Sequence, residues 1–131
     1  MAFAFASIRK RLDRTGIILS GLCAAHCLLT ILLISSFGLG SHFLLSPIFH
    51  RVGLALALVI AAVAIGWGAL RHRRPLPFVI AMMGLTFMGG ALAVPHGSDE
   101  AILTIIGVSL VTLGHVLNLN AAKRASLPKS H

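Results

Sequence analysis

The chain has 131 residues, of which 57% are hydrophobic and 11% charged, and its mean hydropathy of +0.96 excludes an ordinary water-soluble domain. The formal net charge is +8. Because the basic residues lie at the ends of apolar runs and form no polar domain of their own, this charge indicates membrane topology and not nucleic-acid binding.

Four apolar runs predict an all-α integral membrane protein, a bundle of four helices. They are residues 16–37, 52–70, 76–94 and 101–119, and each is close to the roughly 20 residues that a helix needs to cross a bilayer. We therefore divide the chain into a basic N-terminal segment (1–15), a four-span domain (16–120) and a basic tail (121–131). The first run is longer than the roughly 7 to 15 apolar residues of a cleavable signal peptide, so we expect it to be retained.

The N-terminal segment alternates Phe3, Phe5, Ile8 and Leu12 with basic residues. This pattern is typical of a short helix lying on an anionic membrane surface.

The basic residues also predict the orientation of the spans. Ten of the 11 Lys and Arg residues lie before the first run, between the second and third, or after the fourth, and the remaining one is Arg51. Since Lys and Arg favour the cytoplasmic side of short loops, both termini are expected in the cytoplasm.

Small residues at helical spacing predict the contact faces of two runs, because they let helix backbones approach closely. They are Ala55, Ala62 and Gly66 in the second run, and Gly84, Gly89 and Gly90 in the third. Trp67, one turn before a basic link, suits the membrane interface.

The stretch "SGLCAAHCLLT" (residues 20–30) places two thiols and an imidazole inside the first run. On a helix, Cys23 and Cys27 share a face with Cβ atoms about 5 to 6 Å apart. A disulfide needs about 3.5 to 4.5 Å, so we expect thiols. His26 falls in the same sector, and sulfur with nitrogen donors favours soft metal cations.

Depth in the membrane connects these residues to the fourth run. At about 1.5 Å per residue, Cys23 lies roughly 10 Å and His115 roughly 6 Å from the inner boundary. If the first and fourth spans are neighbours, the predicted metal ligands are Cys23, His26, Cys27 and His115. The alternatives are that the cysteines are packing residues and that His115 and Asn118 form hydrogen bonds between helices.

Other candidate residues have simpler interpretations. Met82 and Met83 reach a comparable depth but are expected to fill the core. Five outward residues could collect cations but are expected to be solvated: His42, His50, His96, Asp99 and Glu100. The three acids Asp13, Asp99 and Glu100 are predicted to lie at the membrane edges. No pair of acids is then expected inside the membrane, so we expect that the protein is not an enzyme.

The chain resembles the MerC-type proteins, small four-span proteins that bring Hg(II) into the bacterial cytoplasm. The resemblance rests on "GLCAAHCLLT", the basic N-terminal flank, four spans with both ends inside, and "GHVLN" at the close of the last run. It implies a multi-pass protein of the bacterial inner membrane, with Cys23 and Cys27 as the transmembrane thiol pair and a soft cation, foremost Hg(II), as cargo. No permanently bound cofactor is expected.

The chain also departs from the mercury carriers. Their cysteines are typically paired as C-x-x-C, whereas here three residues intervene, and the tail "NAAKRASLPKSH" has no cysteine. A cytosolic thiol is therefore the expected acceptor.

Several other functions remain open. The chain could be a membrane scaffold or accessory protein, or could bind copper or zinc at the same site. Haem ligation by His26 and His115 is disfavoured, because their predicted depths differ by roughly 8 Å.

Overall fold

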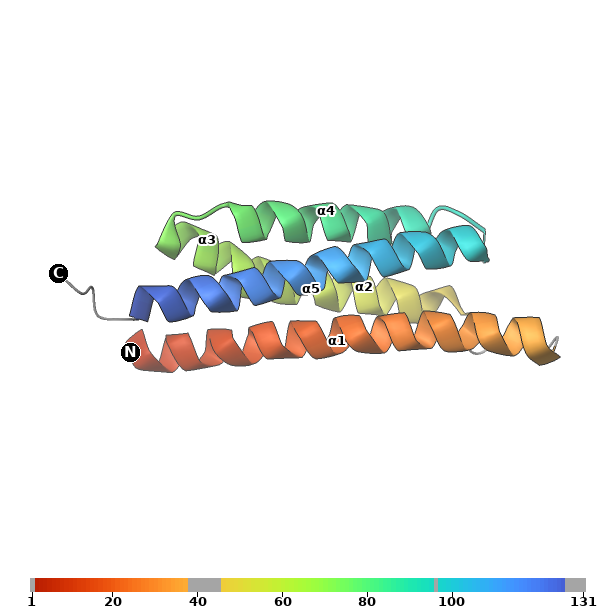
Figure 1. Cartoon of the computed structure of the whole chain (residues 1–131), viewed down its shortest axis with the longest axis horizontal. Coiled ribbons are helices and arrows are strands. Elements are labelled where there is room, and N and C mark those ends of the chain that lie inside the picture. Colours follow the sequence, from red (N-terminus) through yellow and green to blue (C-terminus); the bar gives the residue numbers. More distant parts are fainter. Residues whose placement is uncertain (1, 38–45, 96, 127–131) are drawn as a thin grey trace.

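The computed structural model describes residues 2–37, 46–95 and 97–126, and every regular element in these ranges is helical (Figure 1). The elements are α1 (Ala2–Phe37), α2 (Pro47–Ala61), the π-helix η1 (Ala62–Gly66), α3 (Trp67–His72), α4 (Leu76–Ala91) and α5 (Ser98–Ser126). The predicted all-α class is therefore confirmed.

The helices form a bundle of four rods. The elements α2, η1 and α3 follow one another without a break and make up the second rod, while α1, α4 and α5 are the others. Both α1 and α4 pack against α5 and against the second rod. The start of α1 and the end of α5 lie at the same end of the bundle (Figure 1).

Within the described ranges, three helices are long and apolar enough to cross a membrane: Ala4–Thr30, Arg51–Arg71 and Ser98–Ala125. The third predicted run is shorter than expected. It forms α4, which has 16 residues and ends at Ala91, so its length is about 24 Å. Gly89 and Gly90 stand at the end of this helix, where glycine's weak helix propensity favours termination.

The predicted N-terminal segment does not form a helix of its own. Residues 2–15 are the first part of α1, which continues through 36 residues to Phe37. Phe5 and Ile8 are exposed there and Leu12 is half-buried.

The contact face of the second rod differs from the predicted one. Its buried small residues are Ala57, Ala61, Ala64 and Gly68, whereas Ala55 and Ala62 are exposed and Gly66 is half-buried. The predicted face was wrong because the run is apolar all round. Spacing alone then cannot distinguish the side that meets a neighbouring helix from the side that meets lipid.

Of the three glycines of α4 that were predicted to lie at a contact with another helix, one does so. A Cβ atom on Gly84 would overlap the backbone of Gly107 on α5, so this position does allow close approach. Nothing lies within 4 Å of such an atom on Gly89 or Gly90.

Candidate functional site

One face of α1 carries a row of polar and sulfur-containing side chains into the bundle. Asp13, Gly16, Ser20 and Cys27 are buried, and Cys23 is half-buried. They are spaced alternately three and four residues apart, which is the spacing of one helix face. This face meets α5 and the second rod.

The thiol pair lies toward the middle of α1. The Cys27 side chain is 6% exposed, and Thr104 and Glu100 of α5 face its thiol. Cys23 faces α2, where a Cβ atom on Gly53 would lie 3.5 Å from its sulfur. Neither residue is in a disulfide, as the helical spacing predicts.

His26 turns toward a different neighbour from Cys27. Its ring packs against that of Phe49 on α2, with centroids 5.9 Å apart and planes tilted by 52°. Within the described ranges, no three side chains of His, Cys, Asp or Glu are grouped so that they could hold a metal ion. Among the described side chains, the structure therefore presents two thiols one turn apart without a third ligand grouped beside them.

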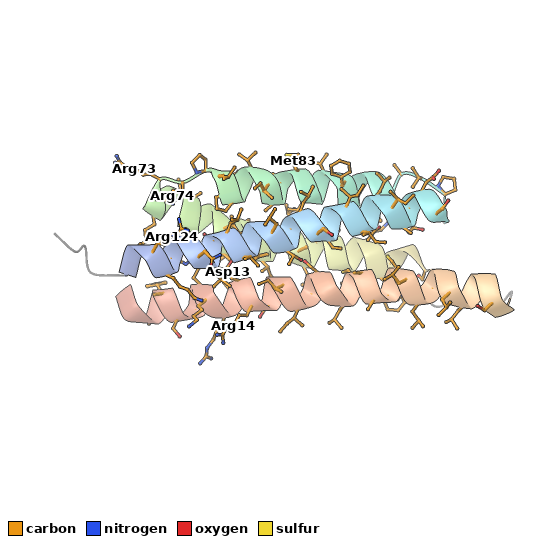
Figure 2. All side chains as sticks on the ribbon, in the orientation of Figure 1. Asp13, Arg14, Arg73, Arg74, Met83 and Arg124 are labelled. Atoms are coloured by element: carbon orange, nitrogen blue, oxygen red, sulfur yellow. The ribbon has the colours of Figure 1, made fainter. Side chains whose placement is uncertain are left out.

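A second group of polar side chains is completely buried nearer the chain termini. Nδ1 of His115 lies 2.8 Å from Oδ1 of Asp13. The amide nitrogen of Asn118 donates to both Asp13 oxygens, at 3.2 and 2.9 Å, and to the Ala64 carbonyl at 3.1 Å. Asp13 and His115 are 0% exposed and Asn118 is 2% exposed. We call Asp13, His115 and Asn118 the buried polar cluster; Figure 2 shows Asp13 between α1 and α5.

Two glycines make room for this cluster. A Cβ atom on Gly16 would overlap the His115 imidazole, and one on Gly68 would overlap the Asn118 amide. Nε2 of His115 faces Gly16 and is buried with no hydrogen-bond partner among the described residues. The cluster thus connects α1, α5 and η1 at positions where glycine leaves room for its side chains.

The structure buries Asp13 and Glu100 within the bundle, so the expectation that Glu100 is solvated was wrong. Asp13 is enclosed in the bundle and Glu100 is only 8% exposed. Asp13 stands between Arg11 and Arg14 in the sequence, so it resembles a solvated residue of a charged flank. The signal that identifies it is its position in the row that continues through Gly16 and Ser20 to the cysteines.

The structure does not bring His115 to the thiol pair. His115 lies beside Asp13 and Gly16, and Gly16 precedes Cys23 by seven residues, or about 10 Å of helix.

The remaining candidates have varied surroundings. Asp99 is exposed, Met82 packs against the core, and Met83 is exposed. His42 and His96 lie outside the described residues, and only the backbone of His50 is described.

The chain was then compared with known proteins. The family model described as MerC mercury resistance protein matches residues 13–120. The chain belongs to the MerC family. Comparison with curated proteins and with solved structures returns no match. The matched range begins at Asp13 and contains both cysteines, His115 and Asn118. Together with the three helices that can cross a membrane, it identifies a multi-pass membrane protein of this family.

Proposed function

We propose that this MerC-family chain carries Hg(II), or a similarly soft cation, inward across the bacterial inner membrane by way of Cys23 and Cys27. The observation that carries the proposal is the placing of these thiols. They lie one turn apart on the interior face of α1, with Cys27 almost completely buried, inside a bundle whose outer surface is largely apolar.

Capture at the pair neutralises the cargo. Two thiols lose their protons to solvent as two metal–sulfur bonds form, and two thiolates with one divalent cation have no net charge. Moving this neutral unit through an apolar interior costs far less than moving the bare ion. Two ligands are sufficient for this step, so it requires neither His26 nor His115.

Glu100 supports the entry of a cation. It is in the first turn of α5 and lies near the Cys27 thiol. If both termini are cytoplasmic, this turn is on the outer side of the bundle. A carboxylate there raises the local concentration of cations beside the first thiol that they meet.

Release proceeds by ligand exchange. The tail has no cysteine, so incoming thiolates from the cytosol replace the two protein thiolates one at a time. Each displaced cysteine thiolate takes up a proton from the cytosol, so the outgoing metal complex is neutral and both protein thiols are regenerated.

The test is uptake of radioactive Hg(II) by cells expressing the chain. Cys23→Ala and Cys27→Ala are each expected to reduce uptake to the level of cells without the protein, because one remaining thiol cannot neutralise the cation. Purified protein in detergent should bind one Hg(II) per chain, and the variant lacking both cysteines should bind none. External thiol is held constant throughout.

A matched control is Ala24→Ser, which introduces a polar group between the two cysteines at a position that packs against the core. It is expected to transport Hg(II) normally. Uptake by the unaltered chain equal to that of empty membranes overturns mercury transport. Binding of Cu(I) or Zn(II) in that case would favour the copper or zinc alternative, and no binding of any of these metals would favour a scaffold.

A further inference from the structure

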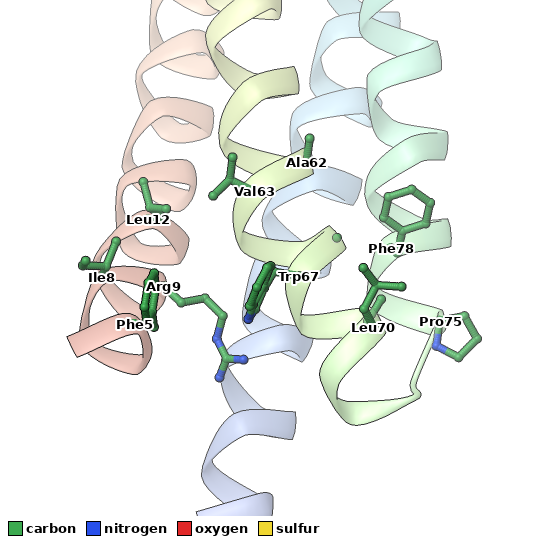
Figure 3. Close-up of a pocket in the computed structure, with 12 residues that line it drawn as sticks. Phe5, Ile8, Arg9, Leu12, Ala62, Val63, Trp67, Leu70, Pro75 and Phe78 are labelled. Carbon is green, nitrogen blue, oxygen red and sulfur yellow. The ribbon is translucent and has the colours of Figure 1, made fainter. Parts of the chain in front are cut away.

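An apolar groove of about 730 Å³ lies between the first turns of α1 and the end of the second rod (Figure 3). Phe5, Ile8 and Leu12 line it from α1, and Val63 and Trp67 line it from the second rod. We call this space the inner groove. Its volume is within the range of about 300 to 1,000 Å³ that is usual for small-molecule sites.

The described part of the chain leaves the walls of the inner groove exposed. Phe5 is 55%, Ile8 52% and Trp67 56% exposed. In a multi-pass membrane protein, the substance that covers such a surface is lipid, and a groove between two helices fits a hydrocarbon chain better than a flat helix face does.

The open end of the groove carries a positive charge. Arg9 lines the groove, and Figure 3 shows its side chain extending from α1 toward Trp67. Phe5 and Trp67 are stacked there, with centroids 6.5 Å apart. Tryptophan prefers the level of the lipid headgroups, and a guanidinium group binds phosphate through charge-assisted hydrogen bonds.

The surroundings favour an anionic lipid over a zwitterionic one. Arg71, Arg73 and Arg74 follow Trp67 by four to seven residues in the sequence, and all three are exposed. Basic residues of this kind beside a membrane attract anionic headgroups.

We propose that the inner groove binds one anionic phospholipid, with an acyl chain between Leu12 and Val63 and the headgroup phosphate at Arg9. This site is separate from the thiol pair. It adds to the Phe5–Trp67 contact between the first turns of α1 and the second rod.

The groove contains its own probe, because Trp67 is the single tryptophan of the chain. Bromine atoms on lipid acyl chains quench tryptophan fluorescence at short range. The full-length protein is placed in vesicles of phosphatidylcholine with a fixed fraction of brominated phosphatidylglycerol, or of brominated phosphatidylcholine. At low salt we expect the anionic lipid to be preferred about fivefold. This ratio corresponds to the attraction of about 1 kcal/mol between one basic residue and an anionic membrane surface.

Two pairs of variants separate the proposed site from general attraction. Arg9→Gln should abolish the preference, whereas Arg14→Gln should retain it, since Arg14 is exposed on the same helix and points away from the bundle (Figure 2). Val63→Phe fills the groove and should reduce quenching by both lipids. Val59→Phe, at an exposed position of the same rod that does not line the groove, should not.

Equal quenching of the unaltered protein by the two lipids would overturn the proposal. Equal effects of Arg9→Gln and Arg14→Gln would also overturn it, because the preference would then come from net charge alone. Circular dichroism of each variant confirms that it is folded, and the Val63 pair still decides if Arg9→Gln does not fold.

Discussion

Asp13 connects the helices at the end of the bundle where the chain termini lie. Its carboxylate accepts hydrogen bonds from Asn118 and lies against Nδ1 of His115, with no exposure to solvent. A buried ionisable group is stable only when its partners compensate for lost solvation. Removing one partner is therefore more costly than the net contribution of the group suggests.

We predict that Asp13→Ala destabilises the protein by about 3 kcal/mol, the usual cost of leaving a buried polar group without its charged partner. Unfolding in mixed detergent micelles measures the effect. Asp99→Ala removes an exposed acid in the first turn of α5 and should cost at most about 1 kcal/mol, through the helix dipole. Equal losses of stability in the two variants would show that the Asp13 carboxylate is hydrated in the membrane and not buried in the bundle.

At the scale of elements, the approach of α1 to α5 depends on the absence of a side chain. Gly16 faces the His115 ring, whereas nothing lies within 4 Å of a Cβ atom placed on Gly21 of the same helix. The two glycines differ in their surroundings but have the same intrinsic effect on helix stability.

Gly16→Ala is expected to destabilise the bundle by about 1 to 3 kcal/mol through overpacking. Gly21→Ala should be neutral or stabilise by up to about 1 kcal/mol, because alanine is the better helix former. Thermal unfolding of the two variants in one detergent gives the comparison. A stabilised Gly16→Ala protein would mean that α1 and α5 are farther apart in the membrane.

The sequence predicts elements here more successfully than their faces. Apolar length and basic flanks identify all four rods, because the cost of exposing peptide groups to hydrocarbon enforces helices wherever a span is apolar. The packing face of the second rod was missed because alanine stands on both sides: Ala57 and Ala61 are buried, whereas Ala55 is exposed. The cysteine pair was found because thiols and an imidazole are rare in such a run.

The sequence predicts only part of the buried polar cluster. His115 and Asn118 were recognised as polar residues inside a span, and hydrogen bonds between helices were one of the two interpretations. Their partner Asp13 was missed because it lies 102 residues from His115 in the chain, and pairing at that distance depends on which rods are neighbours.

At the scale of the whole molecule, the start of α1 and the end of α5 lie at the same end of the bundle (Figure 1). One measurement of membrane topology therefore determines on which side of the membrane both termini lie. The distribution of Lys and Arg predicts that this end is cytoplasmic. A fluorescent protein fused to the C-terminus should therefore fluoresce, and alkaline phosphatase inserted at the exposed Gly97 should be active. Exchanging the two reporters is the control. An active phosphatase at the C-terminus would show that the orientation is opposite to the predicted one.

The shortness of α4 has a consequence for the bilayer itself. Its 16 residues extend about 24 Å, whereas the hydrocarbon core is about 30 Å thick. Lipids around this rod can satisfy the hydrophobic mismatch by compressing their chains. The membrane would then be thinner on one side of the protein than on the other, and the distance that a charged group must cross would be shortest beside α4.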